Sequence, residues 1–558
     1  MLRVWDWAVV GLTLLAVVLY GIWRAGRQKN LESYLVADRA MPWYLVGLSA
    51  MATQASAITF LSTTGQGYAD GMRFVQFYFG LPLAMVVLCV TFAPAFHRLK
   101  VYTAYQFLEQ RFDRKTRTLT AALFLLQRGV STGISIYAPA LVLSVMLGVP
   151  VVWTNLLMGS LVIAYTVTGG VKAVAYTQSF QLAVIWGGMF AAVGILLWHL
   201  PEGLGLGGAL QLAGALGKTD AVTFSWNLND RYNLLSGLIG GFFLQLSYFG
   251  TDQSQVQRYL TGASVTQSRM GLLLNGLVKV PMQFFILLVG VLVAVFYLFT
   301  PGPLYYNPTA SADTRTSAVH GPAFGALEEH YAQAQAARAA AATAYLSDPS
   351  PAAQQALLAA DTTAQGLHRQ ATALVSAHYG SPQLDTDYVF LTYVITYLPV
   401  GLVGLLLAVI FLASMGSIAP AFNSLASCTV VDVYQPYVRP TASQAHYVAA
   451  SRWFTLGWGV LAVVTAAFAA QLGNLIEAVN ILGSLFYGVI LGVFVVAFYL
   501  PRLRANPTFV GAGLAQVVVI GLFVFKVPVS YLWYNFIGCV LVPAFALALQ
   551  ALWPKPKT

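Results

Sequence analysis

The stretch "GLSAMATQASAITFLSTTGQGY", residues 47–68, places small and hydroxyl side chains where a helix in a membrane ordinarily carries large apolar ones. A second stretch of this kind, "ASMGSIAPAFNS" at residues 413–424, follows the apolar run "VGLVGLLLAVIFL". Small residues permit tight helix packing. Backbone that leaves a helix inside a bilayer, however, must line a cavity or be buried in protein. The pairing of the two stretches favours a polar site between them.

The composition predicts a polytopic membrane protein. Of 558 residues, 58% are hydrophobic and 9% are charged, whereas about 25% of residues are charged in soluble domains. The first apolar segment, "WAVVGLTLLAVVLYGIW", is too long for a signal-peptide core and is followed by no A-x-A-like cleavage site. We therefore expect it to be a retained span.

Apolar runs predict an all-α integral membrane protein with about thirteen spans. These start near Val4, Leu45, Phe74, Leu119, Val151, Phe180, Leu234, Leu272, Pro399, Tyr447, Leu472, Phe509 and Val529. Loops after odd-numbered spans hold 19 lysines and arginines, and the N-terminus and the other loops hold 7. The positive-inside rule then places the N-terminus outside the cell membrane and the C-terminus in the cytoplasm. Because the positive charges lie in short loops, the net charge of +10 does not indicate nucleic-acid binding.

The spans divide the chain into seven segments. The Ala-rich stretches of residues 301–386, separated by "SDPSP", predict an external helical hairpin. The segments are 1–41 (first span and cytoplasmic loop), 42–200 (spans 2–6), 201–232 (external loop), 233–300 (spans 7–8), 301–386 (external insertion), 387–500 (spans 9–11) and 501–558 (two last spans and tail).

Charged residues near the spans favour a sodium-driven carrier. Proton-coupled carriers usually place carboxylates within spans. Five aspartates, including Asp252, are expected at loops or span ends, and only Glu477 is expected at membrane depth. Lys279 lies within span 8, about 10 residues from its cytoplasmic end, or ~15 Å. This distance favours a cavity over snorkelling. For Arg128 in span 4 we favour snorkelling.

Four stretches, in order along the chain, resemble the sodium:solute symporter family, whose members include sodium/glucose cotransporters. They are "ESYLVADRAMPWYLVGLSAMATQASAITFLSTTGQGY", "YTVTGGVKAVAYTQSFQ", "FGTDQSQVQRYLTG" and "AFNSLASCTVVDVYQPY". The resemblance implies a LeuT-like core of two inverted five-helix repeats in spans 2–11. It also implies a broken first core helix and transport by alternating access.

The resemblance also implies a central sodium site. Its ligands would be the carbonyls of Ala52, Ala55 and Ala413, position 416, and the Ser417 hydroxyl. Gly416 stands where the family commonly has serine. Gln178 stands where members with a second sodium site carry aspartate, and Ala419 and Pro420 stand in place of serines. One sodium ion, the only metal and the coupling ion, is therefore expected in each cycle.

The predicted function is sodium-coupled symport of a small organic solute, and not an enzymatic activity. Sugars or polyols and organic anions are equally favoured. The tyrosine, amide and lysine of the family's sugar carriers are matched at Tyr248, Gln245 and Lys279, whereas their other contacts fall on Tyr78 and Thr59 and differ. A cation-independent or proton-coupled carrier of the same fold is the alternative. A polytopic enzyme or a channel is less favoured, because the seven histidines are scattered and no pore loop appears. The predicted solute-binding residues are Thr59, Tyr78, Gln245, Tyr248, Lys279, Glu477 and Asn480.

Overall fold

The computed structural model describes residues 3–25, 31–469 and 474–552. The side chains of residues 18, 21, 22, 24, 25, 165 and 168–170 are not described. Several predicted features therefore lie outside the description: the loop charges at Arg24, Arg27 and Lys29, the tail charges at Lys555 and Lys557, and the start of span 11 at Leu472. The described residues form helices and connecting segments, without a β-strand.

Nine helical stretches within the described residues are long and apolar enough to cross a membrane. They are Ala57–Leu99, Arg114–Leu147, Val171–Trp198, Val265–Phe299, Leu402–Tyr437, Gln444–Ala466, Leu475–Tyr499, Ala505–Val524 and Tyr531–Leu552. Shorter apolar helical segments include Val4–Val17 and Val151–Ala164. The all-helical membrane architecture is confirmed, whereas the count of thirteen spans stays a prediction.

The first half of the chain contains the predicted broken helix. Helix α3 (Trp43–Gln54) ends, Ala55 and Ser56 leave the helical conformation, and α4 (Ala57–Asp70) begins. Predicted span 3 starts later than Phe74, because residues 71–78 form a 3-10 segment and Pro82 in the first turn suits a helix start at Leu81. The other elements of this half are α1 (Val4–Ala25), α2 (Leu31–Val36), α5 (Leu81–Val87), a π-helical segment (Leu88–Phe92), α6 (Ala93–Leu99), α7 (Ala104–Arg111) and α8 (Arg114–Leu147).

Predicted spans 5 and 6 lie in one helical element, α9 (Val151–Trp198). Near its start, the Thr154 hydroxyl donates to the Ala140 carbonyl close to the end of α8. Just after its end, His199 Nδ1 lies 3.3 Å from the Tyr393 hydroxyl. The end of α8 and residues 395–398 line one common pocket, so both ends of α9 lie on the same side of the molecule. Its two apolar segments, residues 151–164 and 171–198, therefore run in opposite directions.

The second half contains another interrupted helix. Helices α11 (Gly241–Thr251) and α12 (Gln253–Leu260) are separated by Asp252, whose backbone is extended. In contrast, α18 (Leu402–Cys428) continues through Gly416 and Pro420, so only the first of the two polar stretches leaves the helix. The remaining elements are α10 (Leu206–Ala215), a π-helical segment (Ser236–Gly240), α13 (Val265–Phe299), α17 (Thr386–Tyr397), a second π-helical segment (Thr429–Tyr434), α19 (Gln435–Tyr437), α20 (Gln444–Ala466), α21 (Leu475–Tyr499), α22 (Ala505–Val524) and α23 (Tyr531–Leu552).

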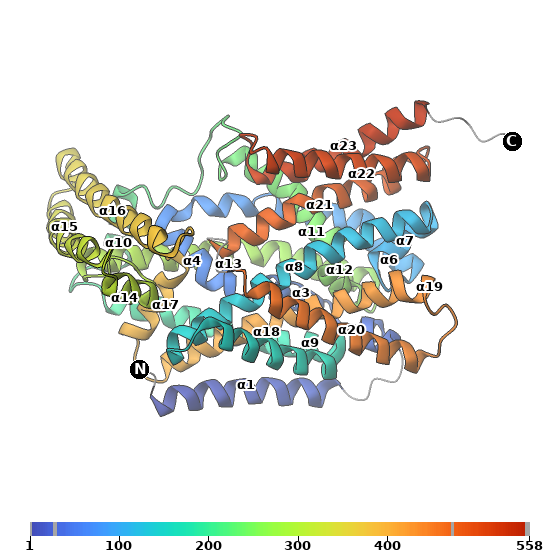
Figure 1. The fold of residues 1–558 in the computed structure, drawn as a ribbon, viewed down its shortest axis with the longest axis horizontal. Helices are drawn as coiled ribbons and strands as arrows, with labels where there is room; N and C mark the ends of the chain where they lie inside the picture. Colours follow the sequence, from blue (N-terminus) through green and yellow to red (C-terminus); the bar gives the residue numbers. More distant parts are fainter. Residues whose placement is uncertain (1–2, 26–30, 470–473, 553–558) are drawn as a thin grey trace.

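A helical hairpin projects from one end of the bundle (Figure 1). Helices α15 (Gly321–Ser347) and α16 (Pro351–Tyr379) pack on each other, joined by the short turn that "SDPSP" predicts, with α14 (Pro308–Thr316) beside them. Helix α1 begins at this end of the bundle, and α23 ends at the opposite end. A chain that crosses the bundle an odd number of times begins and ends at opposite ends in this way.

The bundle is organised around α18, most of whose side chains are buried. It packs on α1, α8, α9 and α20, and it also contacts α3 and α4. Helix α13 packs along both halves of the broken helix. The break between α3 and α4 is thus enclosed by protein, as the absence of water in a bilayer requires.

Candidate functional site

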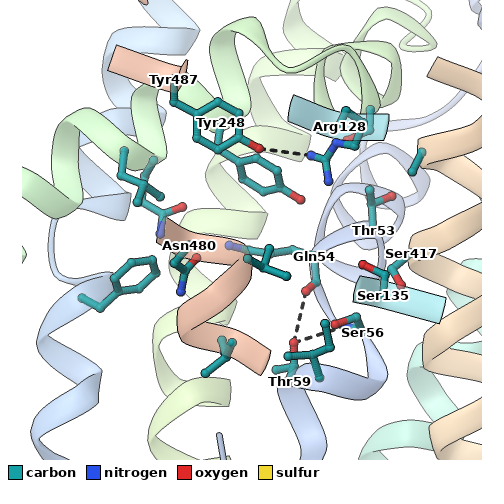
Figure 2. A pocket seen from close by; sticks show the side chains of 18 of the residues that line it. Thr53, Gln54, Ser56, Thr59, Arg128, Ser135, Tyr248, Ser417, Asn480 and Tyr487 are labelled. Atoms are coloured by element: carbon teal, nitrogen blue, oxygen red, sulfur yellow. Dashed lines mark hydrogen bonds between the residues drawn. The ribbon is translucent and has the colours of Figure 1, made fainter. Parts of the chain in front are cut away.

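A cavity of about 100 Å³ lies beside the break between α3 and α4 (Figure 2). The 3-10 segment of residues 71–78 and helices α8, α11, α12, α18 and α21 complete its walls. A polar lining in the interior of a membrane bundle is costly unless it serves a solute or ions. The polar lining side chains are Thr53, Gln54, Ser56, Thr59, Tyr78, Arg128, Ser135, Gln245, Tyr248, Ser254, Ser417, Asn480 and Tyr487.

The break releases two backbone carbonyls from helical bonding. In a continuous helix the Ser56 amide would donate to Ala52, but here it donates to the Gln54 carbonyl at 3.1 Å. The Thr59 amide, which would donate to Ala55, donates to the Ser56 carbonyl at 3.0 Å. The Thr59 hydroxyl stabilises the turn by donating to the Gln54 carbonyl at 3.2 Å. The released carbonyls of Ala52 and Ala55 are those that the resemblance assigns to sodium.

Helix α18 faces this released backbone through its small residues. A Cβ atom on Gly416 would lie 3.7 Å from the Ala52 carbonyl oxygen. Ser417 lines the cavity, and its hydroxyl donates to the Ser414 carbonyl at 3.1 Å, so both oxygen lone pairs remain available as acceptors. Ala413 is buried one turn earlier on the same face as Ser417. Backbone and hydroxyl oxygens of this kind form the donor set of sodium sites in transporters with broken helices.

Two glutamines on α9 approach the same region. Gln178 bonds to side chains of α3 and to the Gly416 carbonyl. Gln181 is 1% exposed, and neither atom of its amide has a hydrogen-bond partner among the described residues. Its Oε1 atom would lie 2.8 Å from a Cβ atom on Gly416. The amide of Gln181 therefore borders the space that a side chain at position 416 would take.

A buried ion pair closes one side of the cavity. The Arg128 guanidinium binds the Asp252 carboxylate and donates to the Tyr487 hydroxyl at 3.3 Å (Figure 2). Tyr487 in turn donates to Asp252 at 2.8 Å, and the ring of Tyr248 lies 5.5 Å from the guanidinium carbon. The prediction that Arg128 snorkels to the membrane surface is therefore wrong. Asp252, the extended residue between α11 and α12, places its carboxylate within reach of the guanidinium.

Comparisons with known proteins identify the family. The sequence model of the sodium:solute symporter family matches residues 34–315 and 355–514, which is most of the chain. The chain belongs to this family. It is therefore a multi-pass membrane transporter that couples solute movement to Na⁺, and not an enzyme. The predicted resemblance is confirmed.

Individual relatives of the symporter transport different solutes. It is 26% identical over 511 residues to the sodium-coupled monocarboxylate transporter 1 of Xenopus laevis, covering 91% of this chain and 70% of that protein. It is 25% identical over 537 residues to the sodium/sialic acid symporter NanT of Aliivibrio fischeri, covering 94% and 89%. The human sodium/iodide cotransporter is 32% identical over 277 residues, which is 49% of this chain and 42% of that protein.

A solved structure confirms the fold of the symporter. The substrate-bound outward-open state of a Na⁺-coupled sialic acid symporter superposes with a TM-score of 0.76 and 20% sequence identity. The superposition covers 100% of this chain and 99% of that one. The predicted LeuT-like fold is therefore confirmed.

The structure brings together most of the residues predicted to bind the symporter's solute. Thr59, Tyr78, Gln245, Tyr248 and Asn480 all line the cavity. Both atoms of the Gln245 amide lack a hydrogen-bond partner within the described ranges. These five residues come from α4, the 3-10 segment that follows it, α11 and α21, so the cavity lies between the two repeats that the family implies.

Lys279 and Glu477 lie outside the lining of the symporter's cavity. The Lys279 side chain is fully buried behind Tyr78, with Nζ 5.9 Å from the ring centroid and without a hydrogen-bond partner among the described residues. Glu477, in the first turn of α21, accepts hydrogen bonds from Arg231 and Tyr232. The Tyr78 ring thus separates Lys279 from the solute space, and Glu477 joins α21 to the segment before α11.

Sequence reasoning missed three residues of the symporter's site. Arg128 and Asp252 lie far apart in the chain, and Asp252 is expected at a loop or span end. The presence of a positive charge within predicted span 4 and a negative charge near the end of predicted span 7 was the available signal for an ion pair. Gln181 ends the stretch "YTQSFQ", yet nothing in its spacing indicates that its amide borders Gly416.

Proposed function

We propose that the symporter uses the sodium gradient to take up a small organic anion through the cavity beside the α3–α4 break. The observation that carries this proposal is the balance of charge around the cavity. Arg128 is the one charged side chain among the described residues that line it, and its charge is matched by Asp252. Lys279, behind Tyr78, is a second basic side chain, and it has no carboxylate partner among the described residues. Protonation of a buried amine without a partner is costly, and an anionic solute in the neighbouring cavity would stabilise its protonated form.

The size and hydrogen-bonding capacity of the cavity support a small solute. Its volume of about 100 Å³ is far below the 300–1,000 Å³ of pockets for drug-sized ligands. The free amide of Gln245 and the side chain of Asn480 supply donors suited to carboxylate oxygens. Three relatives are named for anionic solutes, namely iodide, monocarboxylates and sialic acid.

A sugar or polyol is the second candidate. The sugar-carrier residues matched at Gln245 and Tyr248 do line the cavity, and the sodium/glucose cotransporter of Vibrio parahaemolyticus is 23% identical over 517 residues. A neutral sugar, however, gives the buried amine of Lys279 no partner of opposite charge. The anion is therefore the better candidate.

For the coupling ion, we propose one site between the broken helix and α18. Its ligands would be the carbonyls of Ala52, Ala55 and Ala413 and the hydroxyl of Ser417. Gly416 has no hydroxyl to offer, and the Oε1 atom of Gln181, which borders that position, would take the place of the missing ligand. Sodium is a hard cation that prefers oxygen, so an amide oxygen is a suitable substitute.

For the orientation, we propose a cell-membrane protein with its N-terminus and hairpin outside and its C-terminus in the cytoplasm. The excess of positive charge in odd-numbered loops supports this orientation, as does the start of α1 at the hairpin end of the bundle (Figure 1). With this orientation, we propose the same seven segments that the predicted spans define, with residues 201–232 and 301–386 outside the cell. A cysteine introduced at exposed Val319 should react with an impermeant maleimide added outside intact cells, and one at Tyr437 should not.

Uptake into proteoliposomes tests the function. With sodium outside, the full chain should accumulate [¹⁴C]pyruvate, and replacing sodium with potassium should abolish the accumulation. Unlabelled acetate and lactate should compete, whereas glucose should not. Sodium-dependent accumulation of [¹⁴C]glucose without competition by carboxylates would overturn the anion proposal. Pyruvate accumulation that is unaffected by the sodium gradient would overturn the coupling.

A further inference from the structure

Pro420 leaves one carbonyl of α18 without its helical partner. In an α-helix the carbonyl of residue 416 accepts from the amide of residue 420, but proline has no N–H. An unpaired carbonyl buried in the membrane interior is costly. The Gly416 carbonyl instead accepts a hydrogen bond from Nε2 of Gln178 at 2.5 Å.

Gln178 connects three helices through its amide. Its Nε2 also donates to the Thr53 hydroxyl in α3 at 2.9 Å, and its Oε1 accepts from the Ser49 hydroxyl at 2.5 Å. Because a carbonyl can only accept, the bond to Gly416 fixes which end of the amide carries the hydrogens. Gln178 is fully buried, and both hydrogens of its amide group are used.

The two oxygens bound by Nε2 are the kinds of oxygen that otherwise bind a cation. One is a backbone carbonyl released from its helix and the other is a hydroxyl on the broken helix. Two polarised N–H groups present positive partial charge to these oxygens, as a cation would. Unlike a cation, the amide cannot dissociate during the transport cycle.

We propose that the amide of Gln178 permanently takes the place of a second coupling cation, so that the symporter binds a single sodium ion per chain. This inference rests on the proposed sodium site at Ala52, Ala55, Ala413 and Ser417. Gln178 and Pro420 act together, because the proline creates the acceptor and the glutamine satisfies it. Gln178 is thus a residue that determines the ion stoichiometry without binding sodium itself.

Replacing Nε2 of Gln178 with an oxygen atom should change the predicted number of bound sodium ions from one to two. In Gln178→Glu, a carboxylate oxygen of nearly the same size replaces Nε2 and faces the Gly416 carbonyl and Thr53. Three oxygens then converge without a donor for the carbonyl, and a cation between them relieves the repulsion. Gln178→Asp, one methylene shorter, leaves more room for the ion and provides the same test if the glutamate variant does not fold.

Binding of ²²Na⁺ to the purified full chain in nanodiscs measures the stoichiometry without knowledge of the solute. Wild type should bind one ion per chain with a hyperbolic isotherm, and the acidic variants should bind two. Ser49→Ala is the matched control: it removes the partner of Oε1, keeps both amide donors and should retain one ion. Gln178→Leu should also retain one ion, with an affinity about tenfold lower, because the connection among the three helices is lost.

The outcomes separate this inference from the site on which it rests. Loss of the single wild-type ion in Ser417→Ala supports the proposed sodium site, whatever Gln178 does. Two ions bound by wild type would overturn the role of Gln178 while leaving that site intact. One ion of wild-type affinity in both acidic variants would overturn it equally. No sodium binding by folded wild type would overturn both.

Discussion

The sharpest test of the proposed sodium site is to remove the amide oxygen of Gln181 and to add a hydroxyl oxygen at position 416, first separately and then together. Gln181→Ala removes an amide oxygen from a buried site whose other ligands are backbone carbonyls and one hydroxyl. A contact between a polar group and a charge contributes about 1.5–3 kcal/mol. The sodium concentration at half-maximal uptake should therefore rise at least about tenfold.

Gly416→Ser alone should not improve sodium binding, although it adds a hydroxyl. Its Cβ would lie 2.8 Å from Oε1 of Gln181, which is closer than van der Waals contact. Gln181 must then move, at a cost of about 1–3 kcal/mol for overpacking. In the double variant the serine occupies the space that Gln181 leaves, so its half-saturation should return most of the way to the wild-type value.

The assay is [¹⁴C]pyruvate uptake into proteoliposomes as a function of sodium concentration, for the wild type, both single variants and the double variant. Direct ²²Na⁺ binding should give the same order. Additive effects of the two substitutions would show that the positions do not share one ligand space. An unchanged half-saturation in Gln181→Ala would refute the assignment of its amide to sodium.

Three further predictions concern the Arg128–Asp252 ion pair, the buried Lys279 and the contact between His368 and Asp385. Arg128→Met or Asp252→Asn alone should lower the free energy of unfolding by about 3–5 kcal/mol, measured by SDS titration. The double variant should lose less than the sum of the two single losses, and additive losses would contradict the ion pair. Lys279→Met should abolish pyruvate uptake without lowering stability in the same titration, because it removes a buried basic group that has no partner among the described residues; full uptake would assign Lys279 to structure. Burial alone would lower the pKa of His368, but the Asp385 carboxylate, 3.3 Å from Nε2, and the Leu304 carbonyl raise it above its ordinary value. The stabilisation of α16 by this contact is therefore complete below about pH 6.5 and is lost as the pH rises through the raised pKa. The protection of the α16 amides from exchange, taken relative to their intrinsic base-catalysed rates, should therefore fall at high pH in wild type but not in His368→Gln.

The sequence predicts the parts of this protein that depend on local patterns. Apolar runs and charge counts do not require knowledge of tertiary contacts, so the helical membrane architecture follows from them. The polar stretch at residues 47–68 marks the region of the site, but the break near Ala55 and Ser56 is predicted from the resemblance to the family, since the similar stretch at residues 413–424 remains helical. The hairpin of residues 301–386 is predicted from two Ala-rich stretches separated by a proline-containing turn.

What the sequence does not predict are pairings between distant residues. Arg128 and Asp252 meet only because Asp252 interrupts a helix, and neither residue alone indicates the other. The Gly416 carbonyl is free because of Pro420, but its partner lies on α9, more than two hundred residues earlier. The place of Lys279 within a predicted span indicates a functional role. Only the structure shows that the ring of Tyr78 lies between this lysine and the cavity.

The core of the site contains three buried amides, and at one of them, Gln178, the resemblance places an aspartate in carriers with a second sodium site. Gln178, Gln181 and Gln245 are all fully or almost fully buried beside the broken helix or in the cavity wall. A neutral amide is much less costly to bury than a carboxylate, so these positions can remain polar without a permanently bound cation. The consequence is weaker attraction for sodium, because no full negative charge lies among the proposed ligands. An anionic solute bound in the neighbouring cavity would supply that charge, so sodium and solute should each raise the affinity for the other, as linkage requires.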